Sequence, residues 1–389
     1  MTILLEMAQE IQPDMVAWRR AFHRQPELTY QETGTHRMIR RFLDEMGIPF
    51  LTSGDTITVA EIKGKVPGKT SAIRADTDAL PVCEETGAEY ASRVPGLMHA
   101  CGHDMHMAIG LGAAKLFWEM RDSLPGKAMV IFQPAEEGGH GAGRVVESGL
   151  VDEVNAFFAL HVWPQLETGA YRLSPGPVCA AADKLMFDMA GRSGHGAYPE
   201  LCHSALMAAA ETALALKSLT PDSPQDRPLH VLSMGQIHTG TNWNVIPGGA
   251  RMEGSLRTLD EVLREELHIK IRNMAEASAR KHGCTASLQV DGVCGIVYND
   301  EALTNLVKPA LVETLGEGVA VCQQTALIGD DFSDYRAIAP CCYAHLGVKR
   351  KGQTEVYALH HPKFDPDEAA MPVGLAGLCA SVLAVNQSV

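Results

Sequence analysis

The apolar residues of this chain follow two patterns that alternate along the sequence. Some segments carry apolar residues three or four positions apart, which predicts amphipathic helices, and others are short continuous apolar runs typical of fully buried strands. The predicted helices span residues 3–24, 32–46, 107–120 and 142–148. The predicted strands lie near 56–63, 70–75, 129–132 and 154–164, and within 354–364. This alternation indicates an α/β domain with a mostly parallel sheet and helices on both faces.

The pattern changes between residues 183 and 293. There the order is strand, helix, strand, strand, helix, strand, with partial alternation of apolar and polar residues in the strands. This order predicts a smaller α+β layer of the ferredoxin-like kind, with an antiparallel sheet. We therefore expect a second domain over 183–293, with a surface loop at 221–228, inserted into a larger domain formed by 1–182 and 294–389.

Acidic and histidine side chains follow the predicted strands of the larger domain. These side chains are Asp76 and Asp78, Glu136 and Glu137, His161, and His360 and His361. Ligands of a parallel sheet bind at the carboxyl ends of its strands, so we expect these groups to meet at one edge. A further cluster, MHACGHDMH at residues 98–106, lies where the helix at 107–120 begins. The amino terminus of a helix would favour an anionic Cys101 thiolate there, beside His103.

The candidate metal ligands outnumber those of a single tetrahedral zinc site. They are Cys101, His103, Glu137, His161 and either His360 or His361. A bridging thiolate would divide them into two sets of three, which fits a centre of two metal ions with open positions. Mixed sulfur, nitrogen and oxygen ligands suit zinc, and also manganese, cobalt or nickel. Glu136 would then remain beside an activated water as general base, which favours amide hydrolysis.

Composition excludes several classes of partner. The formal net charge is −14 and no stretch is rich in Lys or Arg, which argues against nucleic acids and anionic membrane surfaces. The first residues resemble neither a signal nor a transit peptide, and we expect no apolar run of membrane-spanning length. The ten cysteines include no C-x-x-C pair, which indicates reduced thiols in a chain this long. We therefore expect a cytoplasmic protein that acts on a small molecule.

Seven segments together resemble the amidohydrolase branch of the aminoacylase/carboxypeptidase metallopeptidase family. They are RADTDALP, MHACGHDMH, FQPAEEGGHGAG, ALHVWP, GRSGHGAYPE, NVIPGGARMEGSLRT and ALHHPKF. That branch includes hippurate hydrolases, N-acyl-amino-acid and N-acetyl-diaminopimelate deacylases, and auxin-conjugate hydrolases. The segments cover nearly the whole chain in the family's order, so the resemblance is specific for the family but weak for the substrate.

The resemblance implies a catalytic domain with two divalent metal ions, and a satellite domain that usually mediates dimerisation. Matched motif by motif, Cys101 corresponds to the residue that bridges the metals. Glu137 and His360 correspond to the other ligands of one metal. His103 and His161 correspond to those of the second metal.

The resemblance also implies roles for residues that do not bind metal. Glu136 corresponds to the general base, and Asp78 to a residue that orients a ligand. His195, in the inserted domain, corresponds to the histidine that holds the oxyanion and that often comes from the partner subunit. Asn244 and Arg257 match positions that contact the substrate, and the fork of Arg257 suits a carboxylate.

These observations predict a homodimeric, metal-dependent amidohydrolase that cleaves N-acyl amino acids, with N-acetyl or hippurate-like substrates. Two departures from the family's pattern bear on the pocket: PELCHSALMAA follows the satellite histidine, and GDDF stands where relatives often have S-E-D-F. One alternative is an exopeptidase that cleaves di- or tripeptides at the same site. Another is a metal-binding protein of the same fold without catalysis, which the carboxylate of Glu136 disfavours.

Overall fold

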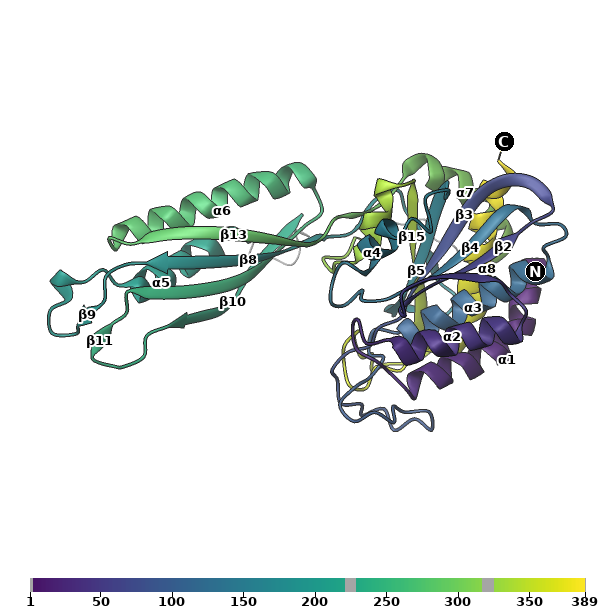
Figure 1. Ribbon diagram of the computed structural model, residues 1–389, viewed down its shortest axis with the longest axis horizontal. Helices are drawn as coiled ribbons and strands as arrows, with labels where there is room; N and C mark the ends of the chain where they lie inside the picture. The colour runs from purple at the N-terminus through teal and green to yellow at the C-terminus, as the bar shows by residue number, and fades with distance from the viewer. Residues whose placement is uncertain (1–2, 221–228, 317–324, 389) are drawn as a thin grey trace. The chain divides into compact units, whose positions relative to one another are not determined.

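A computed structural model describes residues 3–220, 229–316 and 325–388. They divide into two compact units (Figure 1). The first unit comprises Met1–Val178, Tyr298–Gln324 and Asp331–Val389, and the second comprises Cys179–Val297 and Thr325–Asp330. The sequence predicts boundaries after residues 182 and 293, and it assigns 325–330 to the larger domain, whereas that piece belongs to the second unit. The loop predicted at 221–228 lies outside the described residues.

A seven-stranded sheet forms the centre of the first unit. Its strands are β1 (Phe50–Ser53), β2 (Ile57–Lys63), β3 (Val66–Asp76), β4 (Pro125–Gln133), β5 (Ala156–Glu167), β6 (Tyr171–Arg172) and β15 (Cys341–Lys349). Their order across the sheet is β1-β2-β4-β3-β5-β15-β6. The four strands from β4 to β15 are parallel, and the outer strands pair antiparallel. The predicted α/β class with a mostly parallel central sheet is confirmed.

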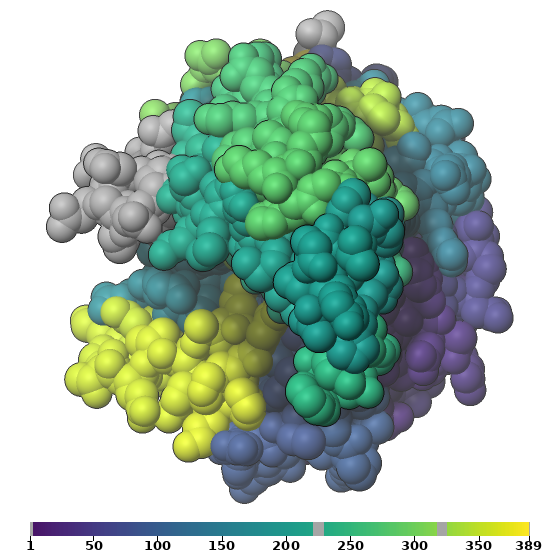
Figure 2. Space-filling view, turned by 90° about the vertical axis from the view of Figure 1, so that its left-hand side faces the viewer, coloured from purple at the N-terminus to yellow at the C-terminus, as the bar shows by residue number. Residues whose placement is uncertain are grey.

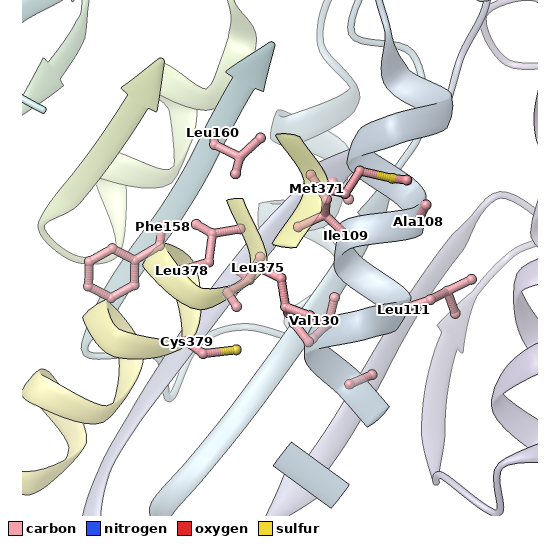
Figure 3. Packing of buried hydrophobic residues seen from close by; sticks show 14 of the residues in the cluster. Ala108, Ile109, Leu111, Val130, Phe158, Leu160, Met371, Leu375, Leu378 and Cys379 are labelled. Carbon is pink, nitrogen blue, oxygen red and sulfur yellow. The ribbon is translucent and has the colours of Figure 1, made fainter. Parts of the chain in front are cut away.

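Helices cover both faces of this sheet. Those on one face are α1 (Ile3–His23), α2 (Thr33–Glu45), α3 (His103–Glu119), α7 (Glu301–Leu315) and α8 (Met371–Gln387), whose apolar residues share one core cluster with the sheet. Figure 3 shows the centre of this core, where Ile109 of α3 and Leu375 of α8 meet Val130 of β4. The other face carries α4 (Gly141–Glu147) and the 3-10 helix η2 (Asp331–Ala337). There Tyr335 stacks on Phe157, with ring centroids 4.8 Å apart.

Helix α8 is the most apolar of the long helices of the first unit. Together with the 3-10 helix η3 (Glu368–Ala370), it is long and apolar enough, by length and composition alone, to cross a membrane. The expectation that no apolar run reaches this length is therefore wrong. However, 72% of the apolar window is buried inside the protein, as expected of a helix that packs against a sheet.

The prediction of a strand within residues 354–364 is wrong as well. That segment has no regular secondary structure, and Val356 is 37% exposed. The buried strand that the sequence reading missed is β15, which pairs with β5. His360 therefore comes from a loop, in which its φ is 68°. His161 was predicted to end a strand, but it lies within β5, opposite His345 of β15.

The second unit is an antiparallel α+β layer. Its strands are β8 (Ala181–Ala190), β10 (His230–Thr239), β12 (Gly249–Thr258) and β13 (Thr285–Cys294), and its helices are α5 (Ala205–Lys217) and α6 (Glu261–Lys281). The strand order β10-β12-β8-β13 confirms the predicted ferredoxin-like arrangement. Both helices share one core cluster with alternate residues of β8, among them Leu185, Phe187 and Met189. Its shorter elements are β9 (Gly194–His195), η1 (Pro199–Leu201) and β11 (Val245–Ile246). The short strands β7 (Gly176–Cys179) and β14 (Val297–Asn299) pair with each other where the chain passes between the units.

The packing of α8 gives a test of the fold. Leu375 is fully buried (0% exposed), whereas Leu306 on α7 is 43% exposed. We expect Leu375→Ala to lower the free energy of unfolding by about 2–5 kcal/mol, because the surrounding core cannot refill the cavity. The matched control Leu306→Ala should cost less than about 1 kcal/mol. Urea denaturation followed by tryptophan fluorescence measures both, and equal losses would contradict the placement of α8 in the core.

Candidate metal centre

The carboxyl ends of the central strands bring polar side chains to one level of the sheet. Asp76 of β3 pairs with Gln133 of β4. Farther along the sheet, His161 of β5 pairs with His345 of β15. The last residues paired between β3 and β5 are Arg74 and Ala159, so Asp76 lies level with His161. Because alternate residues of a strand point to opposite faces, these four side chains point away from the apolar core of the first unit.

Helix α3 brings Cys101 and His103 to this edge. The helix begins at His103, four residues earlier than the predicted 107, and Gly102 precedes it with φ 87°. A Cβ atom at Gly102 would lie 2.4 Å from a methyl carbon of Val162, so only glycine fits this turn. The sharp turn leaves both Cys101 and His103 buried beside β5.

The loop between β4 and α4 carries the two glutamates. Its residues Ala135 and His140 both have positive φ, 59° and 73°. The carboxylate of Asp78 holds the loop, since its Oδ1 accepts the backbone N–H of Glu136 at 3.0 Å and its Oδ2 accepts that of Glu137 at 2.9 Å. Burial alone would raise the pKa of Asp78, but hydrogen bonds from His103, Thr29 and the Glu137 backbone lower it. The carboxylate of Asp78 therefore holds the backbone of both glutamates in place.

The five ligand candidates of the sequence reading come together in two groups that share Cys101. Donor atoms within 4.8 Å of one another belong to Cys101, His103 and His161 in one group. They belong to Cys101, Glu137 and His360 in the other. The Sγ atom of Cys101 lies 3.4 Å from Nε2 of His161, and Nε2 of His360 lies 3.2 Å from Oε1 of Glu137. The backbone N–H of His360 donates to Ala100 O at 2.8 Å, which ties its loop to the α3 turn.

Backbone carbonyls set the tautomers of the two buried histidines. Nδ1 of His103 donates to the carbonyl oxygen of Asp78 at 2.8 Å. Nδ1 of His161 donates to the carbonyl oxygen of Val162 at the same distance, 2.8 Å. Because a carbonyl oxygen only accepts, both rings carry a proton on Nδ1, and in the neutral ring the lone pair of Nε2 is left for the centre of the site. Burial lowers the pKa of His103, but the carboxylates of Asp76 and Asp78 raise it to about 10, so this ring has to release its Nε2 proton when it binds a metal ion. Burial also lowers the pKa of His161 well below its usual range, which keeps its ring neutral, as a metal ligand must be.

The charge balance of the site fits a bound cation. Burial, and after it the carboxylates of Glu137, Glu136 and Asp76, raise the pKa of the Cys101 thiol well above its usual range. Nε2 of His103 is buried and has no hydrogen-bond partner within residues 3–220, 229–316 and 325–388, and the buried Oε1 of Glu137 has only the contact with His360. A divalent ion would satisfy these atoms and stabilise the thiolate, so the donor set fits metal ions.

Further buried groups hold the candidate ligands in place, and His106 is one that the sequence reading expected to support the ligands or to start the helix. His106 donates through Nδ1 to Asp76 at 2.6 Å, and its Nε2 accepts the backbone N–H of Val162 at 3.1 Å. The guanidinium of Arg74 donates to Asp76 and, at 3.0 Å, to Asp331. One signal for His106 was present in the sequence, because it follows His103 by three residues and so shares a helix face with it.

The three predicted site residues of the second unit do not meet within that unit. His195 on β9 and Asn244 lie side by side, since the backbone N–H of Gly196 donates to Asn244 O at 2.8 Å. Figure 2 views the second unit from the end that carries β9 and β11, where these segments reach the surface. Arg257 pairs with Ala182 at the start of β8, whereas β9 follows the other end of that strand, Ala190. Eight residues of extended chain separate these ends by about 27 Å.

Comparisons with known proteins place the chain in a family. Residues 72–384 match the model of peptidase family M20/M25/M40. The chain is 35% identical over 362 residues to N-acetyl-L-cysteine deacetylase of Bacillus subtilis, a match that covers 93% of this chain and 85% of that protein. It is 33% identical over 386 residues to thermostable carboxypeptidase 2 of Saccharolobus solfataricus, with 98% and 97% covered.

The fold agrees with these matches. A Bacillus subtilis crystal structure, described as a dinuclear metal-binding peptidase from the M20 family, superposes with a TM-score of 0.86 at 33% identity. The superposition covers 98% of this chain and 100% of that one. The family that the sequence motifs resemble is thereby confirmed. The chain belongs to peptidase family M20/M25/M40 and is a hydrolase.

Proposed function

We propose that this protein hydrolyses the amide bond of N-acyl amino acids to a carboxylic acid and a free amino acid. The observation that carries the proposal is the pair of donor groups that share Cys101, with a further carboxylate, Glu136, that neither group uses. The similarity to an N-acetyl-L-cysteine deacetylase supports the substrate class. N-acetyl and hippurate-like amino acids are the substrates to try first.

We assign two divalent metal ions to the site, zinc or manganese, with cobalt or nickel as alternatives. In this assignment Cys101 would contribute to both sites, Glu137 and His360 would hold one ion, and His103 and His161 would hold the other. Metal ions in such a site would activate a water molecule as nucleophile and polarise the scissile carbonyl group. Asp78 orients the site by accepting the backbone N–H groups of both glutamates.

Glu136 is the proposed general base. Its Oε2 lies 4.0 Å from Nε2 of His103, at the edge of the donor groups, and the side chain is 10% exposed. In this position it takes a proton from the attacking water and then delivers that proton to the leaving amine nitrogen. Its burial strengthens its interaction with charge that develops at the reacting carbon.

His195, Asn244 and Arg257 are the proposed contacts of the second unit. Nδ1 of His195 accepts the backbone N–H of Ala197 at 3.0 Å, so a neutral ring carries its proton on Nε2 and can donate it to an oxyanion. Arg257 would hold the carboxylate of the amino acid. A separation of about 27 Å is too large for one amino acid to touch His195 and Arg257 of the same chain. We therefore propose that His195 and Asn244 act at the site of a partner subunit.

A homodimer through the second unit is part of this proposal. Helix α5 exposes Leu206, Met207 and Leu214, of which Leu214 is 74% exposed. Strand β10 is an edge strand of the sheet. Apolar side chains beside a sheet edge are a surface that another copy of the chain can cover.

An exopeptidase activity is the second candidate, because the chain is similar to a carboxypeptidase over nearly its whole length. Both reactions need the same activated water and the same base. They differ in whether the acyl side of the scissile bond carries an α-ammonium group.

The base gives the first test. Glu136→Gln keeps the shape of the side chain but cannot accept a proton, so hydrolysis of N-acyl amino acids should fall by about 10²–10⁴-fold. Metal content, measured by atomic emission, should remain at two ions per chain. Turnover at the wild-type rate would rule out Glu136 as the base.

Cys101→Ala is the contrasting variant. It removes the shared ligand, so metal content should fall below two ions per chain, together with activity. Two tightly bound ions in this variant would exclude the thiolate bridge.

The two candidate functions separate on matched substrates. An N-acetyl amino acid and a dipeptide with the same carboxyl-terminal residue differ mainly in the α-ammonium group of the dipeptide. Repulsion between that cation and the metal ions should favour the N-acetyl substrate in kcat/KM by about tenfold or more, or ~1.4 kcal/mol. Preference for the dipeptide would support the exopeptidase.

Mixing two inactive variants tests the action of His195 in a partner's site. Hybrid dimers of Glu136→Gln and His195→Ala would contain one site with both residues intact. Equal mixing with subunit exchange should therefore restore about a quarter of the wild-type activity, because half of the dimers are hybrids. If His195 acts within its own chain, the mixture should stay inactive.

A further inference from the structure

We propose that the segment Thr29–Glu32, here called the 29–32 clamp, fixes the conformation of the loop that carries Glu136 and Glu137. In this proposal Glu32 is a positioning residue, which acts through the loop and does not touch the substrate. The inference rests on the function proposed above for the two glutamates. It adds a set of supporting contacts that lie outside the donor groups.

The clamp touches the loop at both of its ends. At the start, Oε1 of Glu32 accepts the backbone N–H of Ala135 at 2.8 Å. At the far end, the hydroxyl of Tyr30 donates to the carbonyl oxygen of Gly139 at 2.9 Å. Between them, Thr29 donates through its hydroxyl to Oδ2 of Asp78 at 2.8 Å. The carboxylate of Asp78 in turn accepts the backbone N–H groups of both glutamates.

The loop needs such support because its backbone is strained. Ala135 and His140 have φ values of 59° and 73°, which residues with a Cβ atom rarely adopt. The clamp has a similar residue, since the φ of Tyr30 is 62°. A Cβ atom at Gly138 would lie 2.2 Å from a methyl carbon of Thr29, so clamp and loop are packed closely. Strained conformations persist only where surrounding contacts determine them, and the clamp supplies those contacts.

The side chain of Glu32 does not form the hydrogen bond that is usual at its position in a helix. Glu32 is the N-cap of α2, where a side chain commonly accepts a free backbone N–H of the first helical turn, but it makes no such bond. Glu27 does this instead, accepting the N–H of Gly34 at 3.1 Å and that of Thr35 at 2.6 Å. The carboxyl group of Glu32 therefore remains available for Ala135.

The hydrogen bond between Glu32 and Ala135 is buried. The residue is fully buried (0% exposed), and its Oε2 has no hydrogen-bond partner in the part of the chain that the structure describes. Burial raises the pKa of its carboxyl group to about 7, so the neutral acid is well populated near neutral pH. Glutamine resembles that neutral form and keeps the accepting oxygen. Alanine leaves the N–H of Ala135 buried without an acceptor, which releases the start of the loop.

The test compares Glu32→Ala with Glu32→Gln and with a matched control, Glu27→Ala. Metal-free protein is titrated with zinc in competition with a chelating dye, and kcat and KM are measured on an N-acetyl amino acid. In Glu32→Ala the dissociation constant for zinc should rise by about 10–100-fold, because Glu137 is no longer held in place. Its kcat should fall with little change in KM, since Glu136 is displaced as well. Glu32→Gln should stay close to wild type in both measurements.

Glu27→Ala removes a partly buried acceptor just before the clamp but leaves the loop contacts intact. It should lower the unfolding temperature without changing zinc affinity or kcat, so a general loss of stability is separated from a loss of positioning. Should Glu32→Ala fail to fold, Tyr30→Phe removes only the hydroxyl bound to Gly139 and should weaken zinc binding in the same direction.

Zinc binding and kcat at wild-type levels in both Glu32→Ala and Tyr30→Phe would overturn the clamp alone. Equal losses of zinc affinity in Glu32→Ala and Glu27→Ala would also overturn the clamp. A wild-type chain that neither binds zinc nor hydrolyses N-acyl amino acids would instead overturn the proposed function, and the clamp with it.

Discussion

The parallel register of four strands is the constraint on which the site depends. It places Asp76 beside Gln133, and His161 beside His345, on one face of the sheet. A shift of one residue in any of these strands would turn its polar side chain toward the apolar core under α3 and α8. Parallel strands also require long crossovers, and those crossovers carry the α3 turn and the glutamate loop to the same edge. The sheet thus positions His161 directly, and it brings the segments that carry the other candidate ligands to the same edge.

Buried charges hold the start of α3 from two sides. On one side His106 bonds to Asp76, whose charge Arg74 balances. On the other side Asp104 accepts a hydrogen bond from the fully buried Arg19 of α1 at 2.7 Å. Each buried charge costs desolvation energy and is tolerated because it is paired. His103, which directly precedes Asp104 in this first turn, therefore has little freedom to move.

The sequence was sufficient to predict the fold class and to propose candidate ligands. It was not sufficient to predict the contacts that hold some of those residues. Strand ends and a dense Cys/His cluster are local features, so candidate ligands could be proposed by reading along the chain, although only the family resemblance favoured His360 over His361. His360 was assigned to a strand end because apolar residues precede it, but a loop tied to Ala100 holds it. Glu32 gave no signal, since nothing local shows that a helix N-cap reaches a distant loop. Such contacts arise only when the tertiary fold brings the two segments together.

The division of the chain has a consequence for the order in which it can fold during synthesis. The second unit is nearly continuous, from Cys179 to Val297, so its core can close soon after those residues leave the ribosome. The first unit is split, and its sheet lacks β15 and its core lacks α8 until the last fifty or so residues are made. Until then the central strands present an apolar face to solvent. A nascent chain of this protein should therefore depend on chaperones most strongly just before its final helix is complete.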